Sequence, residues 1–481
     1  MEPLVKINDA RWELPQSYKA GMRVSGRIYA SEPMLKHIVG DNCLEQVANV
    51  ACLPGIQKYS LAMPDIHWGY GFPIGGVAAT APDEGGVVSP GGVGYDINCG
   101  VRLMRTDLQK EAVVPRIHGL VNQLFRDIPC GFGTKSDLRL TMADERKLVA
   151  QGARWAVTNG FGEGTDLDFI EENGCMADAE PSNLTERALE RGAGQVGSLG
   201  SGNHFLEVQI VDEVYDETAA NVMGLFLGGV TVMIHCGSRG FGYQVCDDYL
   251  RVLAKAPDKY GIHLPDRQLV SAPVESPEGR EYLASMRCAA NYAFANRQVL
   301  ATKAERSFLH ALGITPRALG MELVYDVPHN IAKFEEHTVD GRRKRLCVHR
   351  KGATRSFPPG HPLVPARYRG IGQPVLVPGD MGRYSFVLTG QQPAMEQTFG
   401  TVCHGAGRLM SRSRIKREMS FDQLRRDMDQ RGVVMMAHGR DTAVEEASMA
   451  YKDVEDVVNV VHTARLAKKV CRLRPVGVIK G

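Results

Sequence analysis

The sequence predicts an α+β fold, because strand-like and helix-like segments come in blocks and not in regular β-α-β alternation. The chain shows no internal repeat and no low-complexity tract, and its 52 glycines indicate many tight turns. Residues able to bind a metal occur in every strand-like block from 96 to 404, which argues against separable domains. We therefore expect one large domain over residues 1–481, built of mixed β-sheets with a helical insertion.

The first hundred residues are expected to form strands and turns. Short apolar runs alternate there with glycine and proline, as in IQKYSLAMPDIHWGYGFPIGGVAAT at 56–80. Residues from about 109 to 192 differ, because polar segments with helical spacing at 144–161 and 181–193 predict the helical insertion.

The rest of the chain again mixes the two kinds of segment. Strand-like pieces are predicted at 204–214, 229–237, 321–327, 375–379 and 384–390. Helical stretches are predicted at 278–313, 422–430 and 444–466, and the chain closes on a strand-like piece at 470–481.

Composition describes a soluble globular protein, with 43% hydrophobic and 23% charged residues. The net charge is only +2, so a nucleic-acid partner would need a local basic patch. Eleven cysteines without CxxC pairs fit a reducing compartment and argue against a disulfide framework. No apolar stretch has the length of a signal-peptide core or a membrane span, so we expect a cytoplasmic protein that has no membrane partner.

One cysteine and four histidines stand in short stretches marked by glycine, proline or asparagine, at the ends of apolar runs. They are Cys99, His204, His235, His329 and His404. With the nearby Asp96, their thiolate and imidazole donors form a set that suits a transition metal, and the open spacing suggests more than one ion. Each residue alone could be a turn aspartate, a buried thiol or a core histidine. Their number favours a metal-dependent catalyst.

His404 has a different setting, CHGAGR. The small residues at 405–407 would let backbone amides approach a phosphate, and Arg408 could neutralise part of its charge. This pattern favours a histidine that attacks phosphorus, and the alternative is an ordinary glycine-rich turn. A second glycine-rich stretch at 377–385 is ambiguous by itself.

A basic segment at 340–361 gathers seven cations, and RSRIKR at 412–417 forms a second cluster. The seven are Arg342, Arg343, Lys344, Arg345, Arg350, Lys351 and Arg355. Binding of a phosphate backbone is one interpretation, and a solvated hairpin rim is the other. On the first interpretation we expect Arg345, Arg350 and Lys351 to contact nucleic-acid phosphates.

Seven segments resemble, in order, signature segments of the RtcB RNA ligases. They are YDINCGVRL, GSLGSGNHFLEV, HCGSRGFG, YDVPHNIAKFE, HRKGATRSFPPG, VLVPGDMGRYSFVLTG and TFGTVCHGAGR. The resemblance runs from about residue 20 to the terminal Lys480-Gly481. It implies an RtcB-like catalytic domain that uses GTP and manganese to join an RNA 2′,3′-cyclic phosphate or 3′-phosphate to a 5′-hydroxyl. The RNA would come from tRNA splicing or RNA repair, with archease as a candidate activating partner.

The resemblance also implies roles for individual residues. Asp96, Cys99 and His204 would hold one Mn²⁺ ion. Cys99, His235 and His329 would hold the other, and His404 would take GMP covalently. The guanylate-contacting positions fall on Asn203, His204, Phe205, Leu206, Glu207, His329, Asn330, Pro378, Gly379, Asp380, Met381, Ser385, His404, Gly405, Ala406, Gly407 and Lys480. Asp380 departs from the small hydroxyl residue expected at its position.

Two rival functions are weighed against a ligase. A two-metal phosphohydrolase or nuclease would use the same ligands but would need no nucleotide-binding loop, so CHGAGR and the terminal lysine weigh against it. A catalytically idle RNA-binding protein would not need the complete set of ligands and nucleophile.

Overall fold

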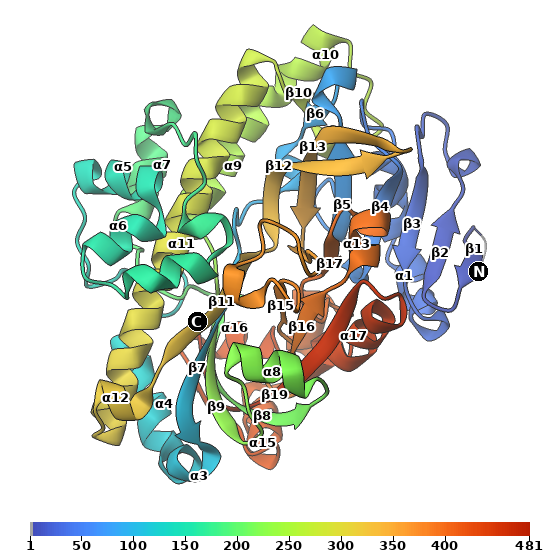
Figure 1. Ribbon diagram of the computed structural model, residues 1–481. Helices are drawn as coiled ribbons and strands as arrows, with labels where there is room; N and C mark the ends of the chain where they lie inside the picture. The colour runs from blue at the N-terminus through green and yellow to red at the C-terminus, as the bar shows by residue number, and fades with distance from the viewer. Residues whose placement is uncertain (1–2) are drawn as a thin grey trace.

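The computed structural model describes residues 3–481, and two large β-sheets form its frame (Figure 1). The seven-stranded sheet has the order β1 (Val5–Asn8), β2 (Arg11–Leu14), β3 (Ser25–Tyr29), β4 (Tyr59–His67), β5 (Ile74–Thr80), β13 (Arg342–Lys351) and β12 (Asn330–Val339). The eight-stranded sheet has the order β11 (Glu322–Pro328), β7 (Gly100–Gln109), β9 (Gly229–Cys236), β8 (Phe205–Val214), β19 (Ala467–Lys480), β16 (Ser385–Gly390) and β15 (Pro374–Val377). Its eighth strand, β18 (Val434–Ala437), pairs with β19 in parallel.

Two short strand pairs complete the β-structure. They are β6 (Val87–Val88) with β10 (Ala272–Pro273), and β14 (Ala353–Arg355) with β17 (Thr401–Cys403). The second pair matters for the site, because β17 ends immediately before His404.

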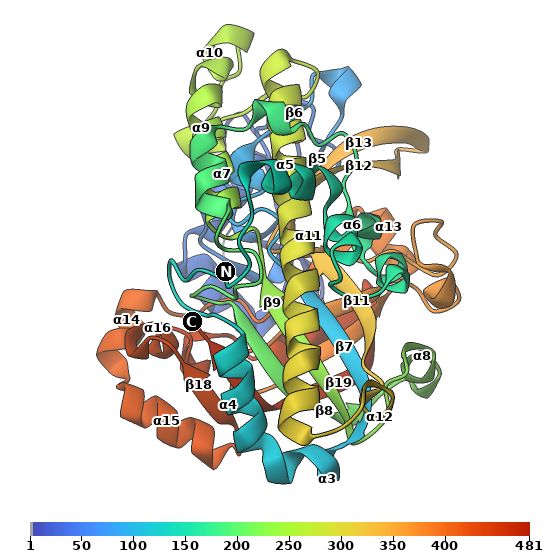
Figure 2. The same cartoon turned by 90° about the vertical axis from the view of Figure 1, so that its left-hand side faces the viewer.

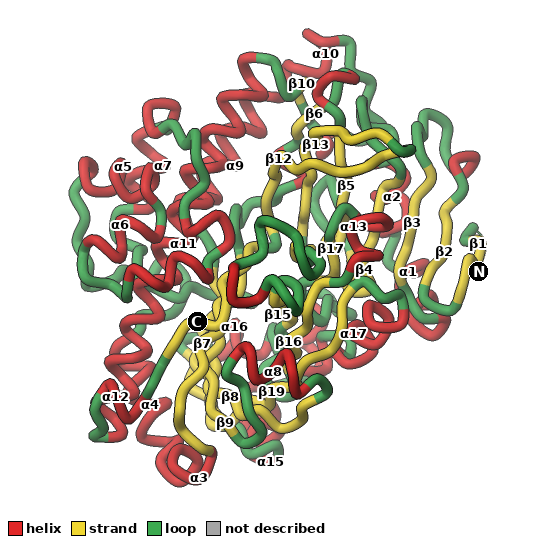
Figure 3. Tube along the Cα trace, in the orientation of Figure 1, coloured by secondary structure: helices red, strands yellow, loops and turns green. Residues whose placement is uncertain are grey.

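Most helices between residues 110 and 319 gather on one side of the strands (Figure 3). They are α3 (Lys110–Val113), α4 (Ile117–Asp127), α5 (Met142–Gln151), α6 (Ala153–Thr158), α7 (Glu186–Gly192), α9 (Arg239–Val252), α10 (Ala256–Tyr260), α11 (Pro277–Leu312) and α12 (Pro316–Leu319). Helix α8 (Glu217–Met223) lies apart from them and packs in a hydrophobic cluster with residues of β7, β11 and β19. The remaining helices are α1 (Leu35–Gly40), α2 (Cys43–Val50), α13 (Gln392–Thr398), α14 (Arg412–Glu418), α15 (Phe421–Gln430), α16 (Arg440–Val444) and α17 (Val454–Thr463).

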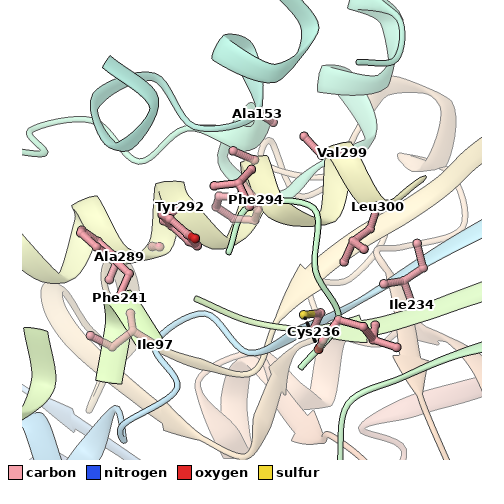
Figure 4. Close-up of a cluster of buried hydrophobic side chains, with 14 of the residues drawn as sticks. Ile97, Ala153, Ile234, Cys236, Phe241, Ala289, Tyr292, Phe294, Val299 and Leu300 are labelled. Carbon is pink, nitrogen blue, oxygen red and sulfur yellow. Dashed lines mark hydrogen bonds between the residues drawn. The ribbon is translucent and has the colours of Figure 1, made fainter. Parts of the chain in front are cut away.

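The 36-residue helix α11 supports the eight-stranded sheet (Figure 2). Its ends follow local signals: the Ser276 side chain accepts a hydrogen bond from the amide of Gly279, and Gly313 leaves the helix with φ of 62°. Its apolar residues pack against β9 and α9, as Figure 4 shows for Tyr292, Leu300 and their neighbours. Because most of this helix is buried, the polar side chains on it must find partners inside the protein.

The α+β prediction is confirmed, and so is the long helix predicted at 278–313. The helix predicted over 444–466 is wrong at its start: α17 begins at Val454, where Asp453 accepts a hydrogen bond from the amide of Glu455. Helices α1, α2 and α9 lie in segments for which the sequence predicted none. The extent of the catalytic domain over 1–481 stays a prediction. Among residues 3–481, no helix combines the length and hydrophobicity needed to cross a bilayer.

Candidate active site

Strand register brings the predicted metal ligands to one edge of the eight-stranded sheet. Gly100 of β7 pairs with both Cys236 of β9 and Pro328 of β11, and Phe205 of β8 pairs with His235. Cys99, His204 and His329 each lie one residue outside these paired positions. They therefore lie close to His235. Cys99, His235 and His329 line a cavity of about 620 Å³ that also reaches β4, β5 and β19, and His204 lies just outside its wall.

The ligand atoms form two groups that share the Cys99 sulfur. In each group, Asp96–Cys99–His204 and Cys99–His235–His329, the ligand atoms all lie within 4.8 Å of one another. The Cys99 Sγ lies 3.2 Å from His235 Nε2 and 3.4 Å from His204 Nε2. His204 Nε2 lies 2.8 Å from Asp96 Oδ2, and His235 Nε2 lies 3.3 Å from His329 Nε2.

In His204 and His235, the Nδ1 atom is hydrogen-bonded to a backbone carbonyl, and this bond orients the ring so that Nε2 faces the cluster. His204 Nδ1 is 3.1 Å from the carbonyl of Leu199, and His235 Nδ1 is 3.1 Å from the carbonyl of Asn203. A carbonyl can only accept, so Nδ1 carries the proton in both histidines and Nε2 is the nitrogen turned toward the cluster. In His204 this Nε2 faces the Asp96 carboxylate, and a metal ion bound there would replace the proton between them. The donor set thus fits a transition-metal ion.

Without a metal, burial favours the neutral forms of Cys99, His235 and His329, but His204 is charged beside Asp96. Burial alone would lower the pKa of His204, and the nearby Cys236 and Asp96 raise it well above the ordinary value. Burial, with Asp96 close by, raises the pKa of the Cys99 thiol to about 12. Burial and the neighbouring histidines lower the pKa of His235 and His329 well below the ordinary value. A bound cation reverses the first effect, because a coordinating thiol loses its proton.

An internal ion-pair network fixes the turn that carries Cys99. Asn98 has a left-handed backbone with φ of 53°. Arg297 of α11 donates hydrogen bonds to the Asn98 carbonyl at 2.8 Å and to the Cys236 carbonyl at 2.9 Å. The carboxylate of Asp326, fully buried, balances Arg297 and Arg102 at 2.7 Å each. Sequence reasoning missed this network, although an arginine within an otherwise apolar stretch of helix was a signal.

His404 is held by a carboxylate that the sequence analysis also missed. Its Nδ1 lies 2.6 Å from Asp65 Oδ2, and the same oxygen accepts the backbone N–H groups of His404 at 2.8 Å and Gly405 at 3.2 Å. Burial alone would raise the pKa of Asp65, but the adjacent His404 holds it below the ordinary value. Because Nδ1 is engaged, Nε2 is the ring nitrogen left free at the cavity that His404 lines.

The nucleophile candidate lies beside the metal ligands. The ring centroids of His404 and His329 are 4.8 Å apart. A buried lysine, Lys452, donates hydrogen bonds to the carbonyls of Pro64 at 2.9 Å and Ile66 at 2.6 Å, which flank Asp65. Burial lowers the pKa of Lys452 to about 8. The lysine thus holds the segment that aims Asp65 at His404.

Most of the residues predicted to contact guanylate line the cavity. Those that do are Asn203, Phe205, His329, Asn330, Pro378, Gly379, Asp380, Met381, His404, Gly405, Ala406, Gly407 and Lys480. His204, Leu206, Glu207 and Ser385 do not line it. Leu206 belongs to a hydrophobic cluster, and Ser385 accepts hydrogen bonds from Gln209 at 3.2 Å and from the amide of Gly379 at 3.3 Å.

Three residues of this set carry an amino or a carboxyl group, and all three are buried. Lys480 donates to the carbonyls of Gly202 at 2.7 Å and His204 at 3.4 Å, so the end of the chain is pinned against the cavity. Burial raises the pKa of Glu207 to about 8. Asp380 pairs with Arg383 and accepts the Ser448 hydroxyl and the Gly382 amide. The carboxylate at this unusual position is therefore neutralised within its own loop.

The prediction that Arg350 and Lys351 contact nucleic acid is wrong. The basic segment forms the hairpin of β12 and β13, and both side chains point into the protein. Arg350 pairs with Glu335 at 2.6 Å, and Lys351 donates to the carbonyls of Tyr70 and Gly91. Arg355, likewise buried, pairs with Glu171 and Glu172. A charge run does not show which side of a strand each residue faces.

Within the two predicted basic clusters, exposed cations lie at two places. Arg342, Arg343 and Arg345 lie at the exposed end of the β12–β13 hairpin. Arg412 at the start of α14 lines the cavity together with Arg408. The segment at 412–417 is therefore the basic cluster that reaches the site.

A cluster of buried metal-ligand side chains, beside a histidine with one free ring nitrogen, is typical of an enzyme that transfers phosphoryl groups. Comparison with known proteins identifies the family. The family model described as tRNA-splicing ligase RtcB matches residues 46–481. The chain therefore belongs to the RtcB family and is an RNA ligase.

Individual relatives agree with this assignment over the full length of the chain. The tRNA-splicing ligase RtcB of Thermococcus kodakarensis is 54% identical over 481 residues, which are 100% of this chain and 99% of the relative. That of Archaeoglobus fulgidus is 53% identical over 478 residues, 99% of each chain. The RNA-splicing ligase RtcB of Mycobacterium tuberculosis is 51% identical over 440 residues, 91% of this chain and 100% of the relative. None of these findings favours the phosphohydrolase or nuclease alternative.

Proposed function

We propose that the protein joins RNA 2′,3′-cyclic phosphate or 3′-phosphate ends to 5′-hydroxyl ends with GTP and two Mn²⁺ ions, through a GMP adduct on His404. The observation that carries this proposal is the placement of His404. Its Nδ1 is bonded to a buried carboxylate 2.6 Å away, and its ring lies 4.8 Å from that of a metal-ligand histidine. A nucleophile that must carry GMP next to a metal needs this combination.

The metal ligands fit two ions that share one sulfur. Asp96, Cys99 and His204 would hold one Mn²⁺ ion. Cys99, His235 and His329 would hold the other. Bound there, the ions would act as Lewis acids on phosphate oxygens and neutralise their charge.

His404 and Asp65 would carry out the first transfer of GMP. His404 Nε2 attacks the α-phosphorus of GTP, so that an N–P bond forms and the bond to pyrophosphate breaks. Asp65 keeps the proton on Nδ1 and stabilises the positive charge that the ring gains. An oxygen of the RNA 3′-phosphate then takes the GMP, and His404 returns to its neutral form.

The last step joins the two RNA ends. The 5′-hydroxyl attacks the activated 3′-phosphate and GMP leaves. A cyclic phosphate end must first be opened by water. Gly405, Ala406 and Gly407 line the cavity where these phosphates would lie.

The joining of two short RNAs tests this function. One strand carries a 3′-phosphate, the other a 5′-hydroxyl, and the protein receives GTP and Mn²⁺. We expect a joined product that depends on both, with release of pyrophosphate and GMP. Joining that proceeds equally without GTP, or cleavage of the strands in place of joining, would overturn the proposal.

Lys480 provides a prediction about the nucleotide. Guanine offers donors at N1 and N2 and an acceptor at O6, so a carboxyl group and a cation can recognise it. Lys480 lines the cavity, and Glu207 lies on the neighbouring strand β8, just outside the cavity wall. We expect Lys480→Met to raise the KM for GTP in adduct formation about tenfold or more, since a hydrogen bond to a charged group is lost. Deletion of Lys480 and Gly481 should act in the same direction.

Both variants should keep a melting temperature close to that of the parent protein. Glu207→Gln should narrow the preference for GTP over ATP. Adduct formation at the parental rate and KM in the truncated protein would place the C-terminal end outside the nucleotide site.

A further inference from the structure

An exposed tryptophan stands at the edge of the active-site cavity. Trp68 follows β4, directly after His67, and lines the cavity with that residue and His404. Its side chain is 50% exposed, and its backbone amide donates to Asp41 at 2.7 Å. Within residues 3–481 the indole ring has no hydrogen-bond, aromatic or cationic partner. A large apolar ring is thus presented, unpaired, beside the polar catalytic cavity.

The same ring also lines a second hollow next to the cavity. This hollow has a volume of about 380 Å³, and Tyr18, Val39 and Leu44 are among its other lining residues. Tyr18 is 39% exposed and Val39 is 38% exposed. Exposed apolar residues that are scattered singly need no explanation, but these adjoin one another and continue the cavity that holds His404.

The charges around Trp68 favour a base over a phosphate. Asp41 lines the cavity on this side, and Glu45, which pairs with Lys19, lines the hollow. The Asp41 carboxylate would repel a phosphate, whereas every nucleobase has a face that can stack on an indole. The cations that line the cavity, Arg408, Arg412 and Lys480, come from other segments and could hold phosphates.

We propose that Trp68 stacks on the base of the RNA nucleotide at the joining site, and that the strand continues from the cavity into the hollow beside Tyr18. This inference rests on the proposed function, because it takes RNA as the substrate. It assigns the indole to RNA and not to the guanine of GTP, since Lys480 and the loops at 377–385 and 405–407 that would hold GTP follow other strands. Trp68 is then a substrate-binding residue that carries out no chemistry.

Tryptophan fluorescence offers a direct test in the full-length protein. The other two tryptophans, Trp12 and Trp155, are 3% and 6% exposed, so a bound base can stack on Trp68 alone. We expect a single-stranded RNA with a 3′-phosphate or a 5′-hydroxyl end to quench the emission of the parent protein. The Trp68→Phe variant should lose this quenching, although filter binding shows that it still binds the RNA. Identical quenching in the variant would contradict the proposal.

Kinetics separate stacking on RNA from a structural role. We expect Trp68→Ala to raise the KM for RNA in joining about tenfold, and Trp68→Phe to raise it less, because an aromatic face is kept. The rate of adduct formation from GTP, measured without RNA, should stay at the parental value. Tyr215→Ala is a matched control, since Tyr215 is an exposed aromatic residue beyond the end of β8 that lies far from His204.

RNA strands that lack the terminal base complete the test. For one of the two RNA strands, removal of the terminal base should weaken joining by the parent protein about as much as the Trp68→Ala substitution does. In the Trp68→Ala variant, removal of the same base should cause no further loss of joining. Unchanged KM in Trp68→Ala, or independent effects of the two changes on both strands, would overturn the proposal. If Trp68→Ala lowered adduct formation as much as it lowered joining, Trp68 would be assigned to GTP binding and the proposal would be overturned. Failure of the parent protein to join RNA at all would instead refute the proposed function.

Discussion

His404→Ala is expected to abolish both the covalent GMP adduct and RNA joining, while leaving the metal content of the protein unchanged. The side chain contacts Asp65 and lies next to His329, but it belongs to neither group of metal-ligand atoms. Removing it therefore removes the nucleophile and spares the metal cluster. Mass spectrometry of the protein after incubation with GTP and Mn²⁺ measures the adduct, and metal analysis measures the ions.

The chemistry of the adduct gives a second readout. A phosphorus–nitrogen bond to histidine should be labile to acid and stable to base. Asp65→Asn keeps an oxygen for the amides of His404 and Gly405 but loses the negative charge beside Nδ1. We expect it to slow adduct formation by roughly 10² to 10⁴-fold, as for other carboxylates that orient a catalytic histidine. A GMP adduct found on a lysine would contradict the assignment of His404.

Cys99→Ala is expected to remove both manganese ions, because its sulfur is common to the two groups of ligand atoms. The affinity for each ion should fall by more than the roughly 10- to 100-fold that loss of an outer hydrogen-bond partner causes. His235→Ala should remove chiefly one ion, since His235 belongs to one group. Titration with Mn²⁺ and elemental analysis of the dialysed protein measure both effects.

A buried cysteine outside the site supplies the control for Cys99. Cys471 is fully buried in β19, toward the end of that strand away from Lys480. Cys471→Ala removes a buried thiol of the same kind, so it should cost some stability and leave two bound ions. Two ions retained at parental affinity in Cys99→Ala would rule out a shared ligand.

The chemical groups of the site could be predicted from short stretches of sequence. Metal binding and covalent catalysis need particular donor atoms, and cysteine and histidine in glycine- and asparagine-marked turns are distinctive enough to be recognised locally. The structure brings Asp96, Cys99, His204, His235 and His329 together as predicted. The two ends of α11 are also set by local sequence signals, namely a capping serine at the start and a glycine after the last turn.

The partners of these groups could not be predicted in the same way. Asp65 contacts His404 across 339 residues of sequence, and Arg297 reaches Asn98 across 199. Neither pair has a local pattern, because each depends on which strands are neighbours and in which register they pair. The basic segment at 340–361 was misjudged for a related reason: alternate residues of a strand face opposite sides, and what covers each side is decided by the whole fold.

The sequence by itself thus predicted the α+β class, a metal-ligand set, a candidate nucleophile and the family resemblance, since each prediction rests on residue types within short segments of the chain. The tertiary structure alone decided that a buried carboxylate orients His404, that Arg350 and Lys351 support the fold, and that Trp68 is exposed at the cavity. Those facts depend on long-range packing, in which burial and strand register determine whether a charged or aromatic side chain meets solvent, a partner or a substrate.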